Sequence, residues 1–257
     1  MEDVVPHEPD FARDQNSLYF PLHFHCRTCF IMDAMRVALD IQKLKSVYGR
    51  VAKRYDFQHA LLTARSDQRG RRIVVEKTVS PGDNVLDCGA GTGSTALLAA
   101  KKAGASGKVT LFDLSEEMLV VAKKRAAAAK VLERIEARTG DMVDLPFDDD
   151  SFDVVLSTYS LCPLYDPAKG ALELFRVVKP GGLIGIAHST DPERPMVKWL
   201  ADRVENVVWL MPLISLGCRS VSVMPSLEQA GGIVTFKKHI GVPLWPFVVI
   251  VVEKPAT

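Results

Sequence analysis

The feature that most constrains this chain is a short apolar run that leads directly into three closely spaced glycines. Residues 85–94 read Val-Leu-Asp-Cys-Gly-Ala-Gly-Thr-Gly-Ser, and an Ala- and Leu-rich stretch typical of a helix begins at Ser94. Glycines permit positive φ and let a ligand approach the backbone, and the first turn of a helix offers unpaired N–H donors and positive potential. The pattern predicts a strand, turn and helix that bind a ligand; a tight turn without a ligand is the alternative.

Strand and helix patterns alternate along the chain from residue 81 onward. Strands are predicted at 84–88, 108–112, 134–139, 152–158 and 183–187, helices at 94–103, 115–130 and 167–178, and a closing pair of strands at 233–237 and 247–252. This order implies βαβ units with right-handed crossovers and helices on both faces of the sheet. We therefore expect an α/β fold, a Rossmann-like doubly wound and mainly parallel sheet, with its ligand crevice at the carboxyl ends of the strands.

The residues around the glycines narrow the class of ligand. The spacing Gly89-x-Gly91-x-Gly93 is tighter than the dinucleotide fingerprint, and no Gly-Lys-Ser/Thr of a phosphate loop follows. Asp87 would repel a phosphate but attract an ammonium group. Asp113 ends the second predicted strand, where a carboxylate can accept two ribose hydroxyls. It could instead cap the next helix, although Ser115 can do so alone.

A third acidic position follows the third predicted strand. Asp141 could accept a hydrogen bond from an adenine amino group, with Met142 against the ring; a simple polar turn is the alternative. Together with Asp87 and Asp113, Asp141 indicates a cationic, adenosine-containing ligand.

Composition and charge exclude several classes of protein. The 257 residues carry a net charge of +1, which gives no general attraction to nucleic acid, and five scattered cysteines indicate thiols rather than a disulfide framework. The acidic N-terminus is unlike a secretory or mitochondrial leader, and no apolar run approaches the roughly 20 residues that span a bilayer. We expect a cytoplasmic protein.

One cluster near the N-terminus has metal-like spacing: His23, His25, Cys26 and Cys29. It lacks a second ligand pair, so we predict no metal, with a structural zinc as the alternative.

The predicted organisation is an irregular extension at 1–32 and one domain at 33–257. Within the domain we expect a helical lid at 33–80, with one helical stretch at 33–62, a cofactor-binding core at 81–190, and an acceptor cover with closing strands at 191–257. Residues 43–77 hold ten Lys or Arg against three acids, either as a solvated face or as a contact for anionic lipid.

The segment Val204–Leu216 is nearly all apolar. It could form a wall for a lipophilic acceptor, with Trp199, Trp209 and Met211 as candidates, or it could be a plain core helix. With the basic region at 43–77 it allows a peripheral approach to a membrane.

Several of these segments together resemble class I S-adenosylmethionine-dependent methyltransferases. They are most similar to the ubiquinone/menaquinone biosynthesis C-methyltransferase family. The resemblance covers roughly residues 45–190 and rests on residues 86–94, 113–119, 140–155 and 178–182, with Val51-Ala52-x-x-Tyr55-Asp56 similar to a motif upstream of the core. It implies a seven-stranded sheet whose last strand is antiparallel and which holds S-adenosylmethionine over the first and fourth strands.

Carried over by position, the resemblance assigns roles to individual residues. It implies that the methionine end of the cofactor is held by Asp87, Gly89, Gly91 and Gly93, and that Ala90 is also a cofactor-binding residue. Asp113 would hold the ribose, and Leu114, Asp141 and Met142 the adenine. Ser157, Tyr159 and Ser160 would face the sulfonium and the acceptor, and Tyr55 would belong to the lid.

The acceptor is less well defined than the cofactor. A small or lipophilic acceptor is expected, with a quinol-type ring carbon as one candidate, although residues 188–225 are shorter than the usual insertion of the quinone-ring enzymes. Such a reaction needs a base, for which Tyr159 and His188 are candidates; His188 could equally be an ordinary strand-end histidine. The alternatives are phospholipid or small-molecule N-methylation and a non-catalytic cofactor-binding module. Arsenite methylation through Cys88, Cys162 and Cys218 is a poor match.

Overall fold

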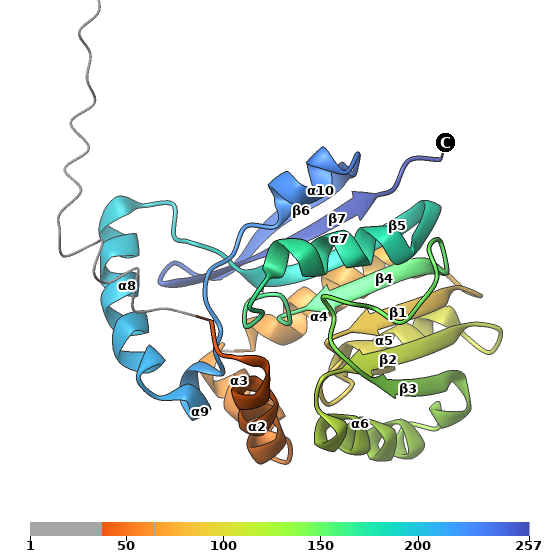
Figure 1. Ribbon diagram of the computed structural model, residues 1–257, viewed down its shortest axis with the longest axis horizontal. Helices are drawn as coiled ribbons and strands as arrows, with labels where there is room; N and C mark the ends of the chain where they lie inside the picture. The colour runs from red at the N-terminus through yellow and green to blue at the C-terminus, as the bar shows by residue number, and fades with distance from the viewer. Residues whose placement is uncertain (1–37, 64, 257) are drawn as a thin grey trace, which may run out of the picture. The chain divides into compact units, whose positions relative to one another are not determined.

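The computed structural model describes residues 38–63 and 65–256, which belong to the second of two units into which the chain divides, Met35–Thr257. A seven-stranded sheet forms its centre (Figure 1), and the strand order is β3-β2-β1-β4-β5-β7-β6. The strands are β1 (Asn84–Cys88), β2 (Lys108–Asp113), β3 (Ile135–Thr139), β4 (Phe152–Thr158), β5 (Val178–Ser189), β6 (Ile233–Val242) and β7 (Trp245–Glu253).

The direction of the strands agrees with the predicted fold. The five strands β1 to β5 run parallel, whereas β7 pairs antiparallel with both β5 and β6. The predicted doubly wound sheet with an antiparallel last strand is therefore confirmed. The strand order reverses between β1 and β4, because the chain continues from β1 outward to β2 and β3 on one side and from β4 outward to β5 on the other. Such a reversal leaves a crevice at the carboxyl ends of the strands.

Two apolar layers hold helices against the two faces of the sheet. In one layer, α4 (Ser66–Thr78), α5 (Ser94–Ala103) and α6 (Glu116–Ala128) pack against strand residues such as Val85 and Leu156. The other joins α7 (Pro167–Val177) and α10 (Met224–Gln229) to residues such as Leu86 and Ile186. Because neighbouring strand residues point to opposite faces, a strand buried on both sides is apolar along its whole length.

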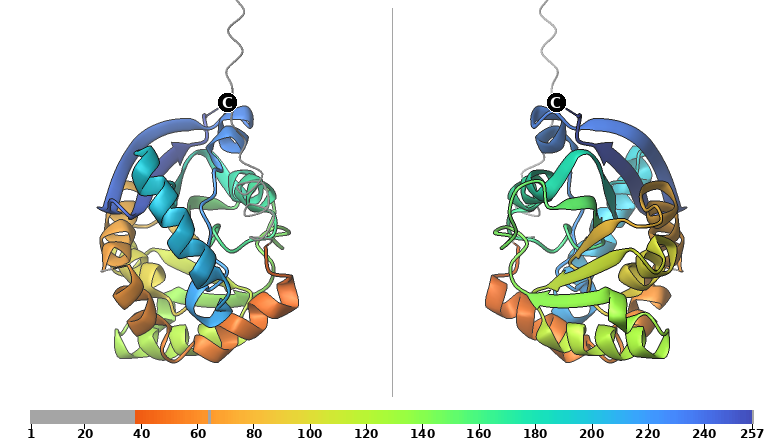
Figure 2. Two further views of the ribbon diagram at one scale, coloured as in Figure 1. Left: turned by 90° about the vertical axis from the view of Figure 1, so that its left-hand side faces the viewer. Right: turned by 90° about the vertical axis from the view of Figure 1, so that its right-hand side faces the viewer.

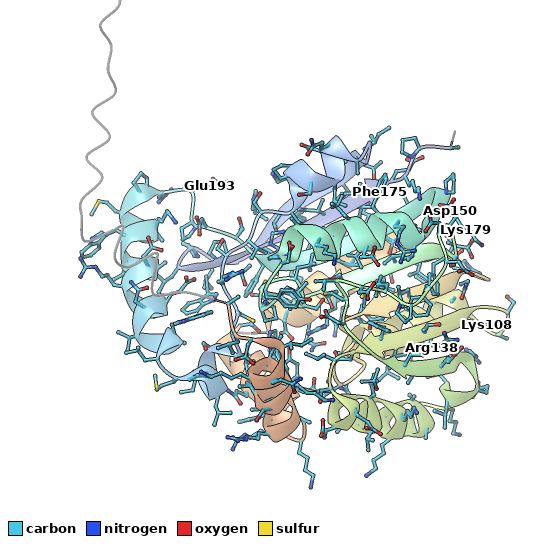
Figure 3. All side chains as sticks on the ribbon, in the orientation of Figure 1. Lys108, Arg138, Asp150, Phe175, Lys179 and Glu193 are labelled. Atoms are coloured by element: carbon cyan, nitrogen blue, oxygen red, sulfur yellow. The ribbon has the colours of Figure 1, made fainter. Side chains whose placement is uncertain are left out.

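The remaining helices gather at the carboxyl ends of the strands. They are α2 (Ile41–Val51), α3 (Tyr55–Leu62), α8 (Pro195–Trp209) and α9 (Pro212–Ser215), and in the left view of Figure 2 α8 and α2 face the viewer. Lys108, the first residue of β2, and Asp150, which precedes β4, lie on the opposite side of the molecule (Figure 3). A single-turn helix, η1 (Leu132–Arg134), precedes β3.

Two helical predictions differ from the structure. The stretch expected as one helix at 33–62 is broken after Val51, because Val51, Ala52 and Tyr55 all turn into one apolar cluster with Met118 of α6 and Leu216. The segment Val204–Leu216 is divided between α8 and α9, since Pro212 cannot continue a helix. It is not a plain core helix, because Val207 and Leu210 are exposed.

Candidate functional site

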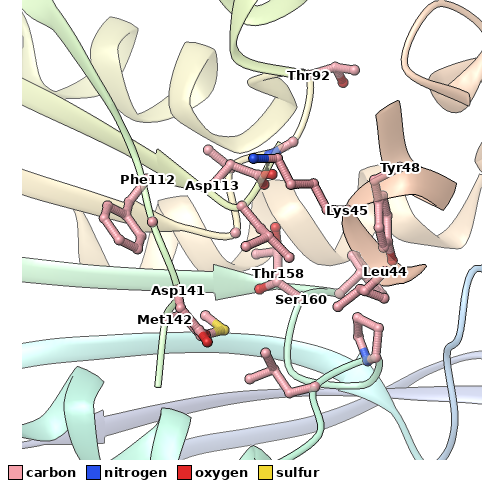
Figure 4. A pocket seen from close by; sticks show the side chains of 18 of the residues that line it. Leu44, Lys45, Tyr48, Thr92, Phe112, Asp113, Asp141, Met142, Thr158 and Ser160 are labelled. Atoms are coloured by element: carbon pink, nitrogen blue, oxygen red, sulfur yellow. Dashed lines mark hydrogen bonds between the residues drawn. The ribbon is translucent and has the colours of Figure 1, made fainter. Parts of the chain in front are cut away.

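A cavity of about 820 Å³, part of it open to solvent, lies at the carboxyl ends of β1, β2 and β4. Its walls include ten residues that the sequence singled out: Tyr55, Gly89, Ala90, Gly91, Asp113, Leu114, Asp141, Met142, Tyr159 and Ser160. Figure 4 shows Leu44, Lys45 and Tyr48 reaching toward the cavity from α2, on the side away from Asp141 and Met142. The size suits a ligand of the nucleoside class.

The glycine-rich turn forms one end of this cavity. Gly89 has φ +73°, and a Cβ added there would lie 2.2 Å from Cβ of Ser160, so no larger residue fits. Gly91 has φ +54°, and a Cβ there would meet no atom within 4 Å, which leaves its backbone open to a ligand. Gly93 lies outside the cavity wall as the N-cap of α5, packed on Ala122 of α6.

Asp113 is fixed by its backbone neighbours. Its Oδ2 accepts a hydrogen bond from the Gly91 N–H at 2.8 Å, and its Oδ1 accepts one from the Ser115 N–H at 2.9 Å. Ser115 itself caps α6 by accepting from the Met118 N–H. Burial raises the pKa of Asp113, and the N–H groups of Ser115 and Gly91 oppose that rise. Each oxygen keeps a further lone pair for a hydroxyl donor.

Asp141 and Met142 form the opposite end of the cavity. Asp141 accepts from the Val143 N–H at 3.1 Å and from the Tyr165 hydroxyl at 2.8 Å. Met142 is buried and packs in the core layer below α7. An acceptor group beside a thioether suits an aromatic base that carries an amino group.

Asp87 is buried behind the glycine turn and does not line the cavity. Neither of its carboxylate oxygens reaches a hydrogen-bond partner among the described residues. Burial raises its pKa to about 7, while the charge of Arg71 works in the opposite direction. Ser157 is also fully buried, and its hydroxyl forms a hydrogen bond of 2.7 Å with the hydroxyl of Ser160. An unpartnered buried carboxylate is costly unless a cation approaches it.

Residues of α2 and α3 line one side of the cavity. Tyr55 is buried and stacks on His59 with a centroid distance of 5.3 Å. The next residue, Asp56, accepts hydrogen bonds from Thr92 at 2.8 Å and from Arg125 of α6 at 2.7 Å. Arg125 also donates to the Thr92 carbonyl at 3.0 Å. These hydrogen bonds among Asp56, Arg125 and Thr92 connect α3 to α6 and the glycine turn.

Arg71 is a buried cation in the wall of the cavity. Its Nη1 donates to the hydroxyls of Thr95 at 3.0 Å and Thr158 at 2.7 Å, and its Nε has no hydrogen-bond partner in the described chain. From the sequence, Arg71 is recognisable only as part of the basic region at 43–77. The signal that could have found it is the four-residue spacing of His59, Thr63, Asp67 and Arg71.

The two residues predicted to be catalytic lie in different surroundings. Tyr159 has φ +61° and lines the cavity; burial raises its pKa despite the charge of Arg71. His188 lines no cavity described here. Its Nδ1 donates to the Ser189 carbonyl at 2.7 Å, its buried Nε2 has no partner in the described chain, and burial lowers its pKa. Both assignments remain predictions.

A second cavity of about 920 Å³ lies beyond Tyr159, which lines both cavities. Its walls are mostly apolar and aromatic, with Trp209, Ile214, Leu216, Trp245 and Phe247, and they also include His59, Cys162 and Cys218. Cys88 belongs instead to the core layer below α7. Trp199 and Met211 are exposed and line neither cavity.

No metal site is found in the described part of the chain, where no three His, Cys, Asp or Glu residues are grouped for one. The cluster of His23, His25, Cys26 and Cys29 lies outside the described residues.

The fold is that of the doubly wound, Rossmann-like α/β proteins, and the cavity lies where ligands bind in that class, at the carboxyl ends of the strands. The YcgJ protein from Bacillus subtilis has a similar fold, with a TM-score of 0.61 and 19% identity over 74% of this chain and 99% of that one.

The sequence identifies the family. The model of the ubiE/COQ5 methyltransferase family matches residues 36–214, and the chain belongs to this family. It is 33% identical over 160 residues to the ubiquinone/menaquinone biosynthesis C-methyltransferase UbiE of Geotalea daltonii, covering 62% of this chain and 68% of that one. It is 40% identical over 159 residues to demethylmenaquinone methyltransferase of Clavibacter sepedonicus, covering 61% of this chain and 62% of that one. The matched segment thus spans about two thirds of these relatives. The chain is an S-adenosylmethionine-dependent methyltransferase, and S-adenosylmethionine is its cofactor.

Proposed function

We propose that this enzyme transfers the methyl group of S-adenosylmethionine to a ring carbon of a lipophilic hydroquinone. The observation that carries the proposal is the pair of cavities that meet at Tyr159, one polar at both ends and the other mostly apolar and aromatic. The names of the two relatives, which refer to quinone C-methylation, support the same class of acceptor.

The residues of the first cavity fit the cofactor. Asp113 would bind the ribose hydroxyls, Asp141 and Met142 the adenine, and the open backbone at Gly91 the methionine portion. Asp87 lies behind the turn with two unpartnered oxygens, so it would favour the ammonium group through space. Arg71, a cation in the wall of the cavity, would favour the carboxylate through its charge.

The protein contributes alignment and exclusion of water. S-adenosylmethionine supplies, when bound, a methyl group already activated by its positive sulfur. The chain must place the acceptor carbon in line with that methyl group and keep water out, which the aromatic side chains around Tyr159 would do. We further propose that residues 33–80 act as the lid, 81–190 as the cofactor-binding core and 191–257 as the acceptor cover.

The test uses the full-length protein with methyl-labelled S-adenosylmethionine. The acceptors are a short-chain 2-prenyl-1,4-naphthohydroquinone, kept reduced under anaerobic conditions, and phosphatidylethanolamine in mixed micelles. We expect a ring-methylated product, identified by mass spectrometry. Label in the phospholipid instead would favour N-methylation. Cofactor binding without turnover of either acceptor would favour a non-catalytic module.

A further inference from the structure

A histidine that the sequence analysis did not single out lies in the wall of the second cavity. His59, on α3, is 7% exposed. Its ring stacks on Tyr55 at 5.3 Å and meets the edge of Tyr159 at 5.4 Å between ring centroids. These two aromatic contacts fix the orientation of the imidazole ring. His59 thus lies beside Tyr159, the residue that lines both the first and the second cavity.

One nitrogen of this ring is engaged by a buried carboxylate. Nδ1 of His59 lies 3.1 Å from Oδ2 of Asp67, on α4, which is 2% exposed. The Thr63 hydroxyl lies 2.9 Å from the other oxygen, and Nε of Arg71 lies 3.8 Å from Oδ2. Burial raises the pKa of Asp67, but the hydrogen bond and charge of His59, with Arg71 and Thr63, outweigh it and hold that pKa below its usual range.

The protonation of this pair follows from the chemistry of the groups. An ionised carboxylate can only accept, so Nδ1 of His59 carries the hydrogen. When His59 is neutral, its lone pair is then on Nε2, and His59 lines the second cavity, where a ligand can reach it. A histidine with one nitrogen held by a carboxylate and the other left for a ligand has the geometry of a general base.

We propose that His59 is the catalytic base of this enzyme, that it takes the hydroxyl proton of a phenol-type acceptor, and that Asp67 is the residue that positions it. The inference deepens the proposed function and rests on it for the identity of the acceptor. His59 takes the place of Tyr159 and His188, the two bases predicted from the sequence. The phenol of Tyr159 has a raised pKa, and His188 is buried and lines neither cavity.

The step balances as follows in atoms and charge. Nε2 of His59 takes the ring hydroxyl proton, the O–H electron pair moves into the ring, and the adjacent ring carbon forms a C–C bond with the methyl group. The C–S bond of the donor breaks with its electron pair left on sulfur, which becomes neutral. The methylated carbon loses its hydrogen to solvent as a proton, and His59 returns the first proton to the ring oxygen. One proton is released overall.

The first arm of the test is independent of the methylation reaction. The probe is 4-nitrophenol, whose phenol and phenolate absorb differently, bound to the full-length protein in the presence of S-adenosylhomocysteine. The titratable or charged groups that contact His59 or its carboxylate are Tyr55, Asp67, Arg71 and Tyr159, and those that line the same cavity are Cys162, Glu205, Cys218 and Arg219. In the unmodified protein we expect the bound probe to ionise at a lower pH than the free probe. In His59→Gln we expect the ionisation constant of the bound probe to be at least about tenfold smaller.

The second arm measures turnover of the prenylated naphthohydroquinone. In His59→Gln we expect kcat to fall about 10²- to 10⁴-fold, with affinity for S-adenosylhomocysteine within about twofold of the unmodified protein. Asp67→Asn should lose both kcat and probe ionisation, and Asp67→Glu should restore part of each. His239→Gln, an exposed histidine on β6, is the matched control.

The outcomes separate this inference from the proposed function. If the probe does not bind, or if it ionises equally in His59→Gln, the base is not His59, even when turnover falls. If ionisation depends on His59 but the hydroquinone is not methylated, the acceptor is wrong and the base assignment stands. Unchanged turnover in His59→Gln overturns the inference directly.

Discussion

At the scale of a single residue, we expect Asp87 to make cofactor binding depend on pH. Its pKa, raised to about 7 in the empty protein, means that it is mostly protonated at pH 6 and mostly ionised at pH 8. The ammonium group of the ligand favours the ionised form, so affinity should rise about tenfold from pH 6 to pH 8. Asp113, whose pKa burial also raises, works in the same direction. Calorimetric titration with S-adenosylhomocysteine measures this. Asp87→Asn should weaken binding at pH 8, and Asp148→Asn, an exposed carboxylate, should not.

The same residue should affect the stability of the empty protein with a defined sign. A folded-state pKa above the unfolded value means that the folded protein binds its proton more tightly, so stability is lost as pH rises through about 7. Asp87→Asn should therefore raise the free energy of unfolding at pH 8 by up to about 4 kcal/mol and change it little at pH 4. Urea titration of the ligand-free protein at both pH values tests this. An equal change at both would contradict it.

Gly89 offers a test of the close approach in the turn. Gly89→Ala adds a methyl group against Ser160 at a φ of +73°, so we expect loss of measurable cofactor binding or at least about a 100-fold weaker affinity. Gly104→Ala is the matched control, because Gly104 has the same φ but its Cβ would meet no atom within 4 Å. Gly104 has ψ −163°, a region occupied almost only by glycine, so that variant should lose about 1 to 3 kcal/mol of stability and still bind the cofactor normally.

At the scale of elements, α3 is tied to α6 and the glycine turn by Arg125. Arg125→Met keeps the apolar stem but removes the hydrogen bonds to Asp56 and Thr92. We expect S-adenosylhomocysteine to dissociate about three- to tenfold faster, because the lid opens more often, with little change in thermal stability. Stopped-flow displacement measures the rate. Arg138→Met, in an exposed pair on β3, is the control. Equal dissociation rates in both variants would exclude the role.

At the scale of the whole molecule, we propose a peripheral contact with membranes, from which a lipophilic acceptor would be drawn. In the described chain no helix is both long and apolar enough to cross a bilayer. Met196 and Trp199 on α8 are 85% and 59% exposed, and the lid is rich in Lys and Arg. Sedimentation with anionic liposomes should retain the protein, and Trp199→Ser with Met196→Ser should lower retention at least about threefold. Val120→Ser, exposed on α6, is the control. No retention of the unmodified protein would exclude the contact.

The strand pattern and the glycine turn by themselves determined the sheet, its winding and the cofactor end of the site, because continuous apolar runs, short turns and a strand-to-helix junction are local properties of a chain. Asp113 and Asp141 could be placed in advance because parallel strands bring their carboxyl ends to one edge. The break after Val51 depended on packing against α6 and Leu216. Likewise, only the tertiary structure decided that His59 meets Asp67 and Tyr159, and that Asp87 is buried without a partner. Such contacts join distant segments, and their energies depend on burial that no local pattern encodes.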